Sequence, residues 1–211
     1  MNVLPRLYAI LDASCFSSCE QFLKTGDEWV SAGVRLIQYR NKSGSTTAML
    51  KPARELRETV SRTRASAPRG LKLIMNDRAD LCLAAEFDGV HVGQDDLPPE
   101  SVRKIVGANR WLGVSTHNPE QVKEADRTSV DYIAVGPVFA TTSKANPDPL
   151  IGLDGVRRAR ALTKKPLVAI GGITRQNCLS VIEAGADSVA VISDLIGEPG
   201  KSAEEFLRIL G

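Results

Sequence analysis

The sequence is poor in the residues that cross-link small secreted proteins or build zinc sites. Only four of its 211 residues are cysteines, and they are Cys15, Cys19, Cys82 and Cys178. No two of them form a C-x-x-C pair, and this dispersal suits the reduced thiols of a cytoplasmic protein. Only two histidines, His91 and His117, are present. A tetrahedral zinc site of cysteines and histidines is therefore not expected.

The sequence also lacks long apolar runs and a strong excess of one charge. No run reaches the roughly 18 apolar residues that a membrane-spanning helix needs. The first residues, "MNVLPRLYAILDAS", lack the pattern of a signal peptide. The formal net charge is +2 and the cations are scattered, unlike those of a nucleic-acid-binding protein. We therefore expect a cytoplasmic protein that binds neither membrane nor nucleic acid, and homo-oligomerisation is left open.

What the sequence does contain is a regular alternation of short apolar runs and amphipathic segments. Eight runs predict strands, at 6–11, 34–39, 71–76, 88–92, 111–115, 131–136, 166–171 and 187–193. The segments between them have helical spacing of apolar residues. This pattern predicts an α/β fold, a (β/α)8 TIM barrel formed as one domain by residues 1–211. The rival is an open doubly wound sheet, which usually has a G-x-G-x-x-G turn after its first strand. Here "AILDASCF" has no such glycines.

Polar residues follow the predicted strands at their carboxyl ends, where the active sites of TIM barrels form. The second strand ends "QYRNK", the third ends in Asn76 and Asp77, and the fourth is followed by "GQDD". The opposite ends are unremarkable, with "AGV", "PRG", "AEF" and "KKP". This asymmetry predicts an active site at the carboxyl-terminal rim of the barrel.

The charges at this rim predict phosphate chemistry. Arg40, Lys42 and Lys144 would be cations near one mouth. The acids Asp77 and Asp96 fit beside phosphates only if a cation lies between them, and Mg²⁺ binds one or two carboxylates together with phosphate oxygens. Backbone N–H groups after the last two strands suit a second phosphate. The residues thus favour two phosphorylated substrates, or one substrate with phosphate at both ends.

Several of these residues also have purely structural explanations. Asp77 and Asp80 could simply cap the helix that begins near them. Arg40 and Lys42 could pair with Asp12 or Asp77 in a network that only shapes the rim. His91 lies inside a predicted strand and is expected to fill the core rather than to carry protons.

The ordered rim motifs resemble those of the thiamine phosphate synthase (thiamine-phosphate pyrophosphorylase) family. They are "QYRNK", "ND" at 76–77, "HVGQDD", "GVSTHN", "GPVFATTSK", "AIGGI" and "VIS", and they span nearly the whole chain. In one departure, the family's T-x-T-K has Ser143 in place of its second threonine. Serine keeps the hydroxyl, so binding is expected to survive.

The resemblance implies a transferase that condenses 4-amino-2-methyl-5-(diphosphooxymethyl)pyrimidine with 4-methyl-5-(2-phosphooxyethyl)thiazole. The pyrimidine diphosphate would be held by Gln38, Tyr39, Arg40, Asn41, Lys42, Asn76, Ser115 and Lys144. The thiazole phosphate would be held by Thr141, Thr142, Ser143, Gly172, Ile192 and Ser193. Asp77 and Asp96 resemble the Mg²⁺ ligands, and Arg40, Lys42 and Lys144 the catalytic cations.

The implied reaction is dissociative. Pyrophosphate leaves first, and the thiazole nitrogen traps the resulting pyrimidine methyl cation. Two alternatives stay open. A thiazole tautomerase-like barrel would use His117 as an acid–base group without Mg²⁺. A non-catalytic binder of thiamine phosphate would keep the fold without turnover.

Overall fold

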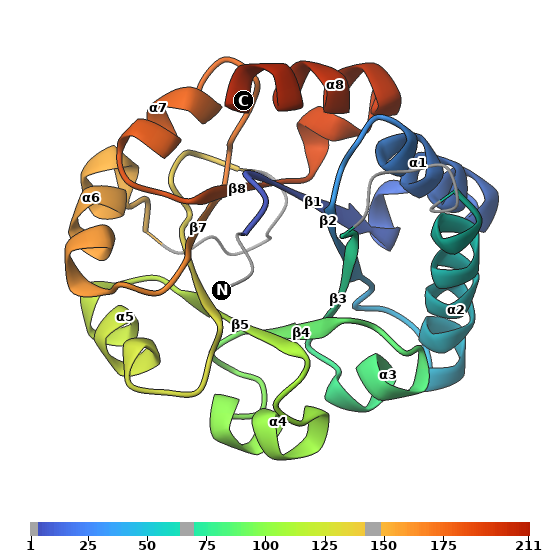
Figure 1. Cartoon of the computed structure of the whole chain (residues 1–211), viewed down its shortest axis with the longest axis horizontal. Helices are drawn as coiled ribbons and strands as arrows, with labels where there is room; N and C mark the ends of the chain where they lie inside the picture. Colours follow the sequence, from blue (N-terminus) through green and yellow to red (C-terminus); the bar gives the residue numbers. More distant parts are fainter. Residues whose placement is uncertain (1–3, 64–69, 142–148) are drawn as a thin grey trace.

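The computed structural model describes residues 4–63, 70–141 and 149–211. In these parts of the chain, strands alternate with helices and pair in parallel. They close into a barrel in sequence order, from β1 round to β8. The helices form a ring around the barrel (Figure 1). The predicted (β/α)8 fold is confirmed.

The observed strands match the predicted ones to within two residues at each end. They are β1 (Leu7–Asp12), β2 (Leu36–Arg40), β3 (Lys72–Asn76), β4 (Gly89–Val92), β5 (Trp111–Thr116), β6 (Tyr132–Val135), β7 (Leu167–Ile170) and β8 (Ser188–Val191). The helices are α1 (Cys19–Ser31), α2 (Thr46–Thr63), α3 (Ala79–Ala84), α4 (Pro99–Val106), α5 (Pro119–Asp126), α6 (Gly152–Leu162), α7 (Cys178–Glu183) and α8 (Pro199–Leu210). Two 3-10 turns, η1 (Ala13–Cys15) and η2 (Ser193–Leu195), follow β1 and β8.

Several helix ends lie where capping residues predict them. Ser18 accepts a hydrogen bond from the Gln21 N–H at the start of α1, at 3.2 Å. Asn118 does the same for α5. Gly33 has a positive φ just beyond the end of α1, a conformation that glycine adopts without steric cost. Among the described helices, none has the length and apolar character of a membrane span.

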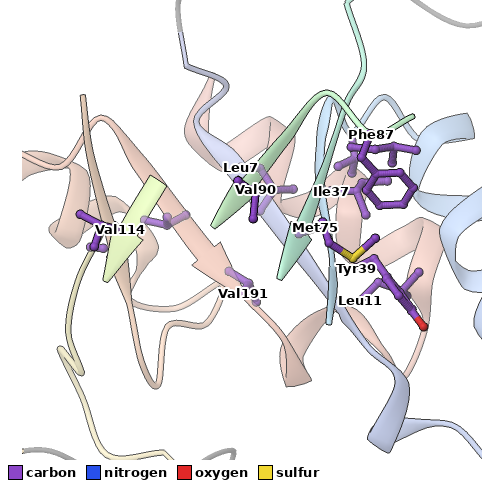
Figure 2. Packing of buried hydrophobic residues seen from close by; sticks show 14 of the residues in the cluster. Leu7, Leu11, Ile37, Tyr39, Met75, Phe87, Val90, Val114 and Val191 are labelled. Atoms are coloured by element: carbon purple, nitrogen blue, oxygen red, sulfur yellow. The ribbon is translucent and has the colours of Figure 1, made fainter. Parts of the chain in front are cut away.

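Both faces of the barrel strands are buried, which explains their nearly continuous apolar sequences. One cluster lies between strands and helices (Figure 2); it includes Leu7, Leu11, Ile37, Met75, Val90 and Val191. The other cluster includes Tyr8, Ile10, Leu36, Ile74, Tyr132 and Val168. Because these residues alternate with those of the first cluster, they fill the barrel interior. Each fully buried leucine, isoleucine or valine stabilises the fold by about 1.5–3 kcal/mol.

One glycine makes room for a large interior side chain. Gly113 on β5 pairs in register with Tyr132 on β6. A Cβ atom at Gly113 would lie 2.0 Å from Cζ of Tyr132 and 2.4 Å from its hydroxyl oxygen. Glycine therefore lets the tyrosine ring lie across β5 inside the barrel, where its hydroxyl reaches residues from other strands.

Candidate functional site

The structure places the predicted site residues that it describes at the carboxyl ends of the strands. Gln38, Tyr39 and Arg40 end β2, Asn76 ends β3 and Ser115 is the penultimate residue of β5. The loops after the strands carry Asn41, Lys42, Asp77, Asp96, Thr141, Gly172, Ile192 and Ser193. Thr142, Ser143 and Lys144 lie outside the described residues.

Arg40 is held by an acid that ends the neighbouring strand. Asp12 on β1 pairs in register with Arg40 on β2, and its carboxylate accepts a hydrogen bond from the guanidinium. The other carboxylate oxygen of Asp12 accepts bonds from the N–H and hydroxyl of Ser14, at 3.0 Å and 2.8 Å. Because Asp12 is buried, these bonds hold the guanidinium at the rim in one place. Sequence reasoning offered this pairing only as an alternative to substrate binding.

Lys42, Asp77 and Asp96 form a second charged group. The Lys42 ammonium lies 3.2 Å from Oδ2 of Asp77. Asp96 accepts a hydrogen bond from the N–H of Gly93, at 2.7 Å. Burial raises the pKa of Asp77, and the adjacent Asp96 carboxylate raises it further, while Lys42 opposes both effects. Two carboxylates this close disfavour one another's charge, so a bound cation would stabilise the pair.

Asp77 does not cap the following helix, so that alternative is wrong. The residue at the cap position of α3 is Arg78, and it makes no side-chain capping bond. Asp77 instead has a left-handed backbone, with φ of 61°, which is uncommon for residues other than glycine. Such strained residues are concentrated at functional sites.

The Asp77 and Asp96 carboxylates suit Mg²⁺ better than zinc. Within the described ranges, no cluster of three or more histidines, cysteines or acids is arranged to hold a metal. Mg²⁺ needs only one or two protein carboxylates when substrate phosphates and waters complete its shell. The donor set therefore fits a metal that arrives with a phosphorylated substrate.

Asn76 points to a ligand beside these charges. Its side chain is 8% exposed, and its Nδ2 is the one buried side-chain nitrogen or oxygen in the described chain that has no hydrogen-bond partner. An orphaned buried donor costs about 1–3 kcal/mol. A substrate acceptor at this position would remove that cost.

Gln38 and Ser115 are linked through the barrel interior. Nε2 of Gln38 lies 2.8 Å from the Tyr8 hydroxyl, which lies 3.0 Å from that of Tyr132. The Tyr132 hydroxyl lies 3.0 Å from Nδ1 of His91, whose Nε2 lies 2.8 Å from Oγ of Ser115. Burial lowers the pKa of His91 to about 4, so its ring is neutral at pH 7. This agrees with the expectation that His91 belongs to the core.

Two residues that the resemblance assigns to the substrates have other contacts here. The Tyr39 side chain belongs to the cluster between strands and helices, and its hydroxyl donates to the Met49 carbonyl at 2.9 Å. Only its backbone is therefore at the rim. Asn41 donates to the Tyr39 hydroxyl at 3.1 Å. The rim histidine His117 places Nδ1 2.8 Å from the Gly136 carbonyl.

The loop that follows β7 is held in a tight conformation. Gly172 has φ of 62°, and a Cβ there would lie 2.4 Å from the Ala140 carbonyl oxygen. The Gly172 carbonyl accepts from the Asn177 side chain at 3.0 Å. This packing brings the loop against the one that follows β6, where Thr141 lies.

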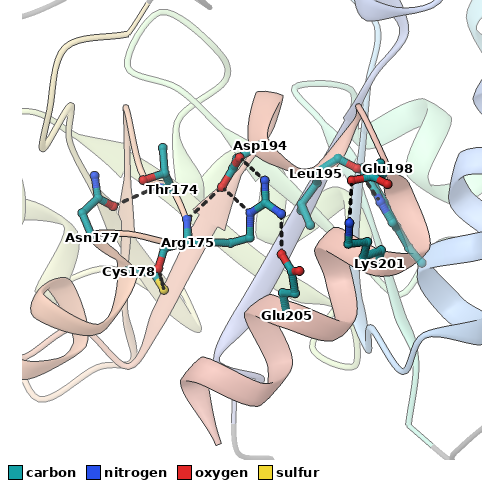
Figure 3. A network of polar contacts seen from close by, with 10 residues as sticks. Thr174, Arg175, Asn177, Cys178, Asp194, Leu195, Glu198, Lys201 and Glu205 are labelled. Carbon is teal, nitrogen blue, oxygen red and sulfur yellow. Dashed lines mark hydrogen bonds and ion pairs between the residues drawn. The ribbon is translucent and has the colours of Figure 1, made fainter.

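Arg175 ties this loop to the segment after β8 (Figure 3). Its guanidinium donates to both oxygens of Asp194 in η2, at 3.1 Å and 3.0 Å, and also to Glu205 in α8. Its backbone N–H donates to Asp194 at 2.8 Å. The two segments expected to bind the second phosphate are therefore joined. Sequence reasoning missed Arg175, because no local motif shows that residues 175 and 194 meet.

A cavity lies at the opposite end of the barrel, away from the rim residues expected to bind the phosphorylated substrates. It has a volume of about 1030 Å³ and is lined in part by Arg160, Lys165 and Asp187. Arg160 donates to Asp187 at 2.8 Å, and Lys165 donates to the Val130 carbonyl at 3.0 Å. These charges already connect elements of the fold.

Comparison with known proteins agrees with the rim geometry. The family model described as thiamine monophosphate synthase matches residues 7–195. A thiamine-phosphate synthase from Koribacter versatilis is 57% identical over 210 residues, which cover 98% of this chain and 96% of that protein. One from Chloroflexus aurantiacus is 43% identical over 191 residues, covering 90% and 85%. The solved structure of a thiamine phosphate pyrophosphorylase from Pyrococcus furiosus matches with a TM-score of 0.84 and 31% identity, over 97% of this chain and 95% of that one. The chain belongs to the thiamine monophosphate synthase family.

Proposed function

We propose that this chain is a thiamine-phosphate synthase, which condenses the aminopyrimidine methyl diphosphate with the thiazole phosphate and releases pyrophosphate. The observation that carries the proposal is the buried, unpartnered amide of Asn76 beside two cations and the close pair Asp77 and Asp96. This arrangement suits an anionic substrate that brings a metal with it. The 57% identity to a named synthase over almost the whole chain supports the same reaction.

The pyrimidine diphosphate would lie over β2 to β5. Gln38, Asn76 and Ser115 are polar residues of this part of the interior. Arg40 and Lys42 would bind the diphosphate, and Lys144 would join them from outside the described residues. Tyr39 and Asn41 would contribute backbone groups.

Asp77 and Asp96 would hold Mg²⁺. When bound, the ion would neutralise the diphosphate and stabilise the charge that gathers on it as it leaves. Without it, Lys42 partly balances Asp77. The same lysine would turn to the diphosphate when the carboxylates take up the metal.

The residues of the chain would act on charge and position. The bond between the pyrimidine methylene carbon and the diphosphate oxygen breaks, and its electron pair leaves with pyrophosphate. Arg40, held by Asp12, stabilises that developing negative charge, as preorganised electrostatic groups do in many enzymes. The lone pair of the thiazole nitrogen then forms the new C–N bond. No side chain needs to serve as a nucleophile, and close placement of the two substrates supplies much of the remaining acceleration.

The thiazole phosphate would lie over the loops after β6, β7 and β8. Gly172, Ile192 and Ser193 would offer backbone groups to it, and Thr141, Thr142 and Ser143 would offer hydroxyls. The contacts of Arg175 with Asp194 would hold the loop after β7 against the segment after β8.

The test is an assay of purified protein with both substrates, with Mg²⁺ or with a chelator, that follows thiamine phosphate and pyrophosphate. We expect equal amounts of the two products only with Mg²⁺. Asp77→Asn and Asp96→Asn should each lower kcat by about 100-fold or more. Asparagine at position 77 tolerates the left-handed backbone. The control is Asp95→Asn, which makes the same charge change at an exposed neighbour and should keep full activity.

Two results would overturn the proposal. Full Mg²⁺-dependent activity in both aspartate variants would refute the metal assignment. Isomerisation of the thiazole phosphate alone, without the pyrimidine partner and without Mg²⁺, would instead establish the tautomerase alternative.

A further inference from the structure

Five buried or half-buried side chains from five strands form one hydrogen-bonded chain across the barrel interior. Its order is Gln38, Tyr8, Tyr132, His91 and Ser115, and each neighbouring pair of atoms lies 2.8–3.0 Å apart. We name it the interior chain. Its two ends are residues that the proposed function assigns to the pyrimidine diphosphate. Its three middle members have no role in that function.

The protons of the interior chain can be assigned one after another. Gln38 donates from Nε2, so the Tyr8 oxygen accepts and its proton goes to the Tyr132 oxygen. The Tyr132 proton then goes to Nδ1 of His91. A neutral imidazole accepts through one nitrogen and donates through the other. Nε2 of His91 therefore carries the ring proton and donates it to Ser115.

This order fixes what the two ends offer to a ligand. Gln38 has used an amide proton within the chain, which leaves its carbonyl oxygen as an acceptor. Ser115 has accepted a proton from His91, which leaves its own hydroxyl proton as a donor. If the donor and acceptor exchanged roles in only one of the four hydrogen bonds, a neighbouring pair of atoms would have either two protons between them or none. All four hydrogen bonds must therefore change direction together. The hydrogen-bonding characters of Gln38 and Ser115 are therefore coupled.

The fold is built to hold this chain in place. Gly113 leaves the space that the Tyr132 ring occupies, because a Cβ there would overlap the ring. Tyr132 stacks on His91 with ring centroids 5.5 Å apart, and meets Tyr8 edge-on at 6.0 Å. Tyr8 and Tyr132 are each 1% exposed, so water does not compete for their hydroxyls.

The unpartnered Asn76 amide lies next to the chain. Asn76 pairs in register with His91 across β3 and β4. Its orphaned Nδ2 indicates that an acceptor belonging to a ligand lies at this end of the interior chain. The chain thus ends where a ligand is needed.

We propose that Tyr8, Tyr132 and His91 are positioning residues that set the donor and acceptor characters of Gln38 and Ser115. Through them the enzyme selects an aminopyrimidine over its oxo analogue. This inference rests on the proposed function. The amino group of the substrate donates to the Gln38 oxygen, and an acceptor on the same substrate receives the Ser115 proton. An oxo group in place of the amino group would face the Gln38 oxygen, and two acceptors repel.

The first test measures the proton on His91 without any substrate. Nitrogen-15 NMR of histidine-labelled protein at pH 7 should show the Nε2–H tautomer at His91. The protein has only two histidines. The signals that disappear in a His117→Asn variant belong to His117, and those that remain belong to His91. In Tyr132→Phe, the ring loses the donor to Nδ1 and should become a mixture of tautomers. A wild-type ring protonated on Nδ1, or one unchanged in Tyr132→Phe, would overturn the proposal. This outcome is independent of whether the protein makes thiamine phosphate.

The second test measures the ratio of kcat/KM for the aminopyrimidine diphosphate to that for its 4-oxo analogue. In Tyr8→Phe the Gln38 side-chain amide can flip, because it no longer donates to a hydroxyl. In Tyr132→Phe the Tyr8 hydroxyl proton can rotate towards Gln38. Each variant should lower the ratio by about 10-fold, within the cost of one mispaired buried polar group. The double variant should lower it by little more, because both changes break one chain.

The matched control is Thr116→Val. Thr116 is also buried on β5, and its hydroxyl donates to the Ala134 carbonyl at 2.9 Å, outside the interior chain. Its loss should reduce stability and leave the ratio unchanged. Equal falls in the ratio for Thr116→Val and Tyr8→Phe would show a general packing effect and refute selection by the interior chain.

Discussion

Substitution of Gly113 by alanine should be among the most damaging single-methyl additions to this barrel. The new Cβ would lie 2.0 Å from Cζ of Tyr132, whereas ordinary van der Waals contact begins near 3.4 Å. The ring must therefore move or β5 must shift. Overpacking of this kind costs about 1–3 kcal/mol. The displaced hydroxyl would also lose its bonds to Tyr8 and His91, at about 1 kcal/mol each.

The expected total is a loss of about 3–5 kcal/mol in the free energy of unfolding. For a chain of this length, the thermal midpoint should fall on the order of 10 °C. Urea unfolding followed by far-ultraviolet circular dichroism measures the free energy, and calorimetry measures the midpoint. Gly197→Ala is the control, because no atom lies within 4 Å of the added Cβ. It should change the free energy by less than about 1 kcal/mol.

A second-site variant separates the clash from a general intolerance of alanine in β5. Tyr132→Leu removes the ring that the new methyl would meet. In that background, Gly113→Ala should cost less than about 1 kcal/mol further, a strong non-additivity for residues in contact. The packing argument would be refuted if Gly113→Ala cost no more than Gly197→Ala in the otherwise unchanged chain.

Three further changes follow from other contacts. Asp12→Asn should loosen Arg40 and raise KM for the pyrimidine diphosphate about 10-fold, since the carboxylate that pairs with the guanidinium becomes a neutral amide, which accepts a weaker hydrogen bond. An unchanged KM in steady-state kinetics would contradict the role of this pair. Arg175→Ala should lower the thermal midpoint and raise KM for the thiazole phosphate alone; an equal rise for both substrates would contradict its action on one loop. The free energy of unfolding should fall as pH drops from 6.5 towards about 4, because in this window the unfolded chain binds a proton that buried His91 does not. The shift in the pKa of His91 is worth about 3 kcal/mol in total. Urea titrations of wild type and His91→Gln at pH 7 and pH 5 measure its effect on the free energy of unfolding, and the same pH dependence in both proteins would refute the role of His91.

The fold was predictable because the barrel strands are short, apolar and separated by helical patterns. Which side chains of a strand point into the barrel and which point towards the helices was not predictable, since both faces are buried and apolar. Tyr8, Tyr39 and Tyr132 all lie in such strands, yet Tyr8 and Tyr132 fill the interior and Tyr39 packs towards the helices. Periodicity gives no sign of this difference when neither face meets water.

The rim was predictable for a similar reason, because polar residues stand out at the ends of apolar runs. The pairing of Arg40 with Asp12 was one of the alternatives that the sequence allowed. The contacts of Arg175 with Asp194 and Glu205 were not predictable, because they form only where the segments after β7 and β8 lie side by side in the folded barrel. The separation of two residues along the sequence does not indicate whether they are in contact in the fold. The structure also excludes a cap at Asp77, which local sequence alone allowed.

Closure of the strands in sequence order makes the ends of the described chain neighbours. β1 pairs with β8, and the Arg6 guanidinium donates to the Leu210 carbonyl at 2.5 Å. In topological terms, the polypeptide is a ring that is cut at one place, and the cut lies at the end of the barrel away from the rim. A circularly permuted chain, joined between these ends and opened between α5 and β6, would keep every strand pairing and every rim loop intact.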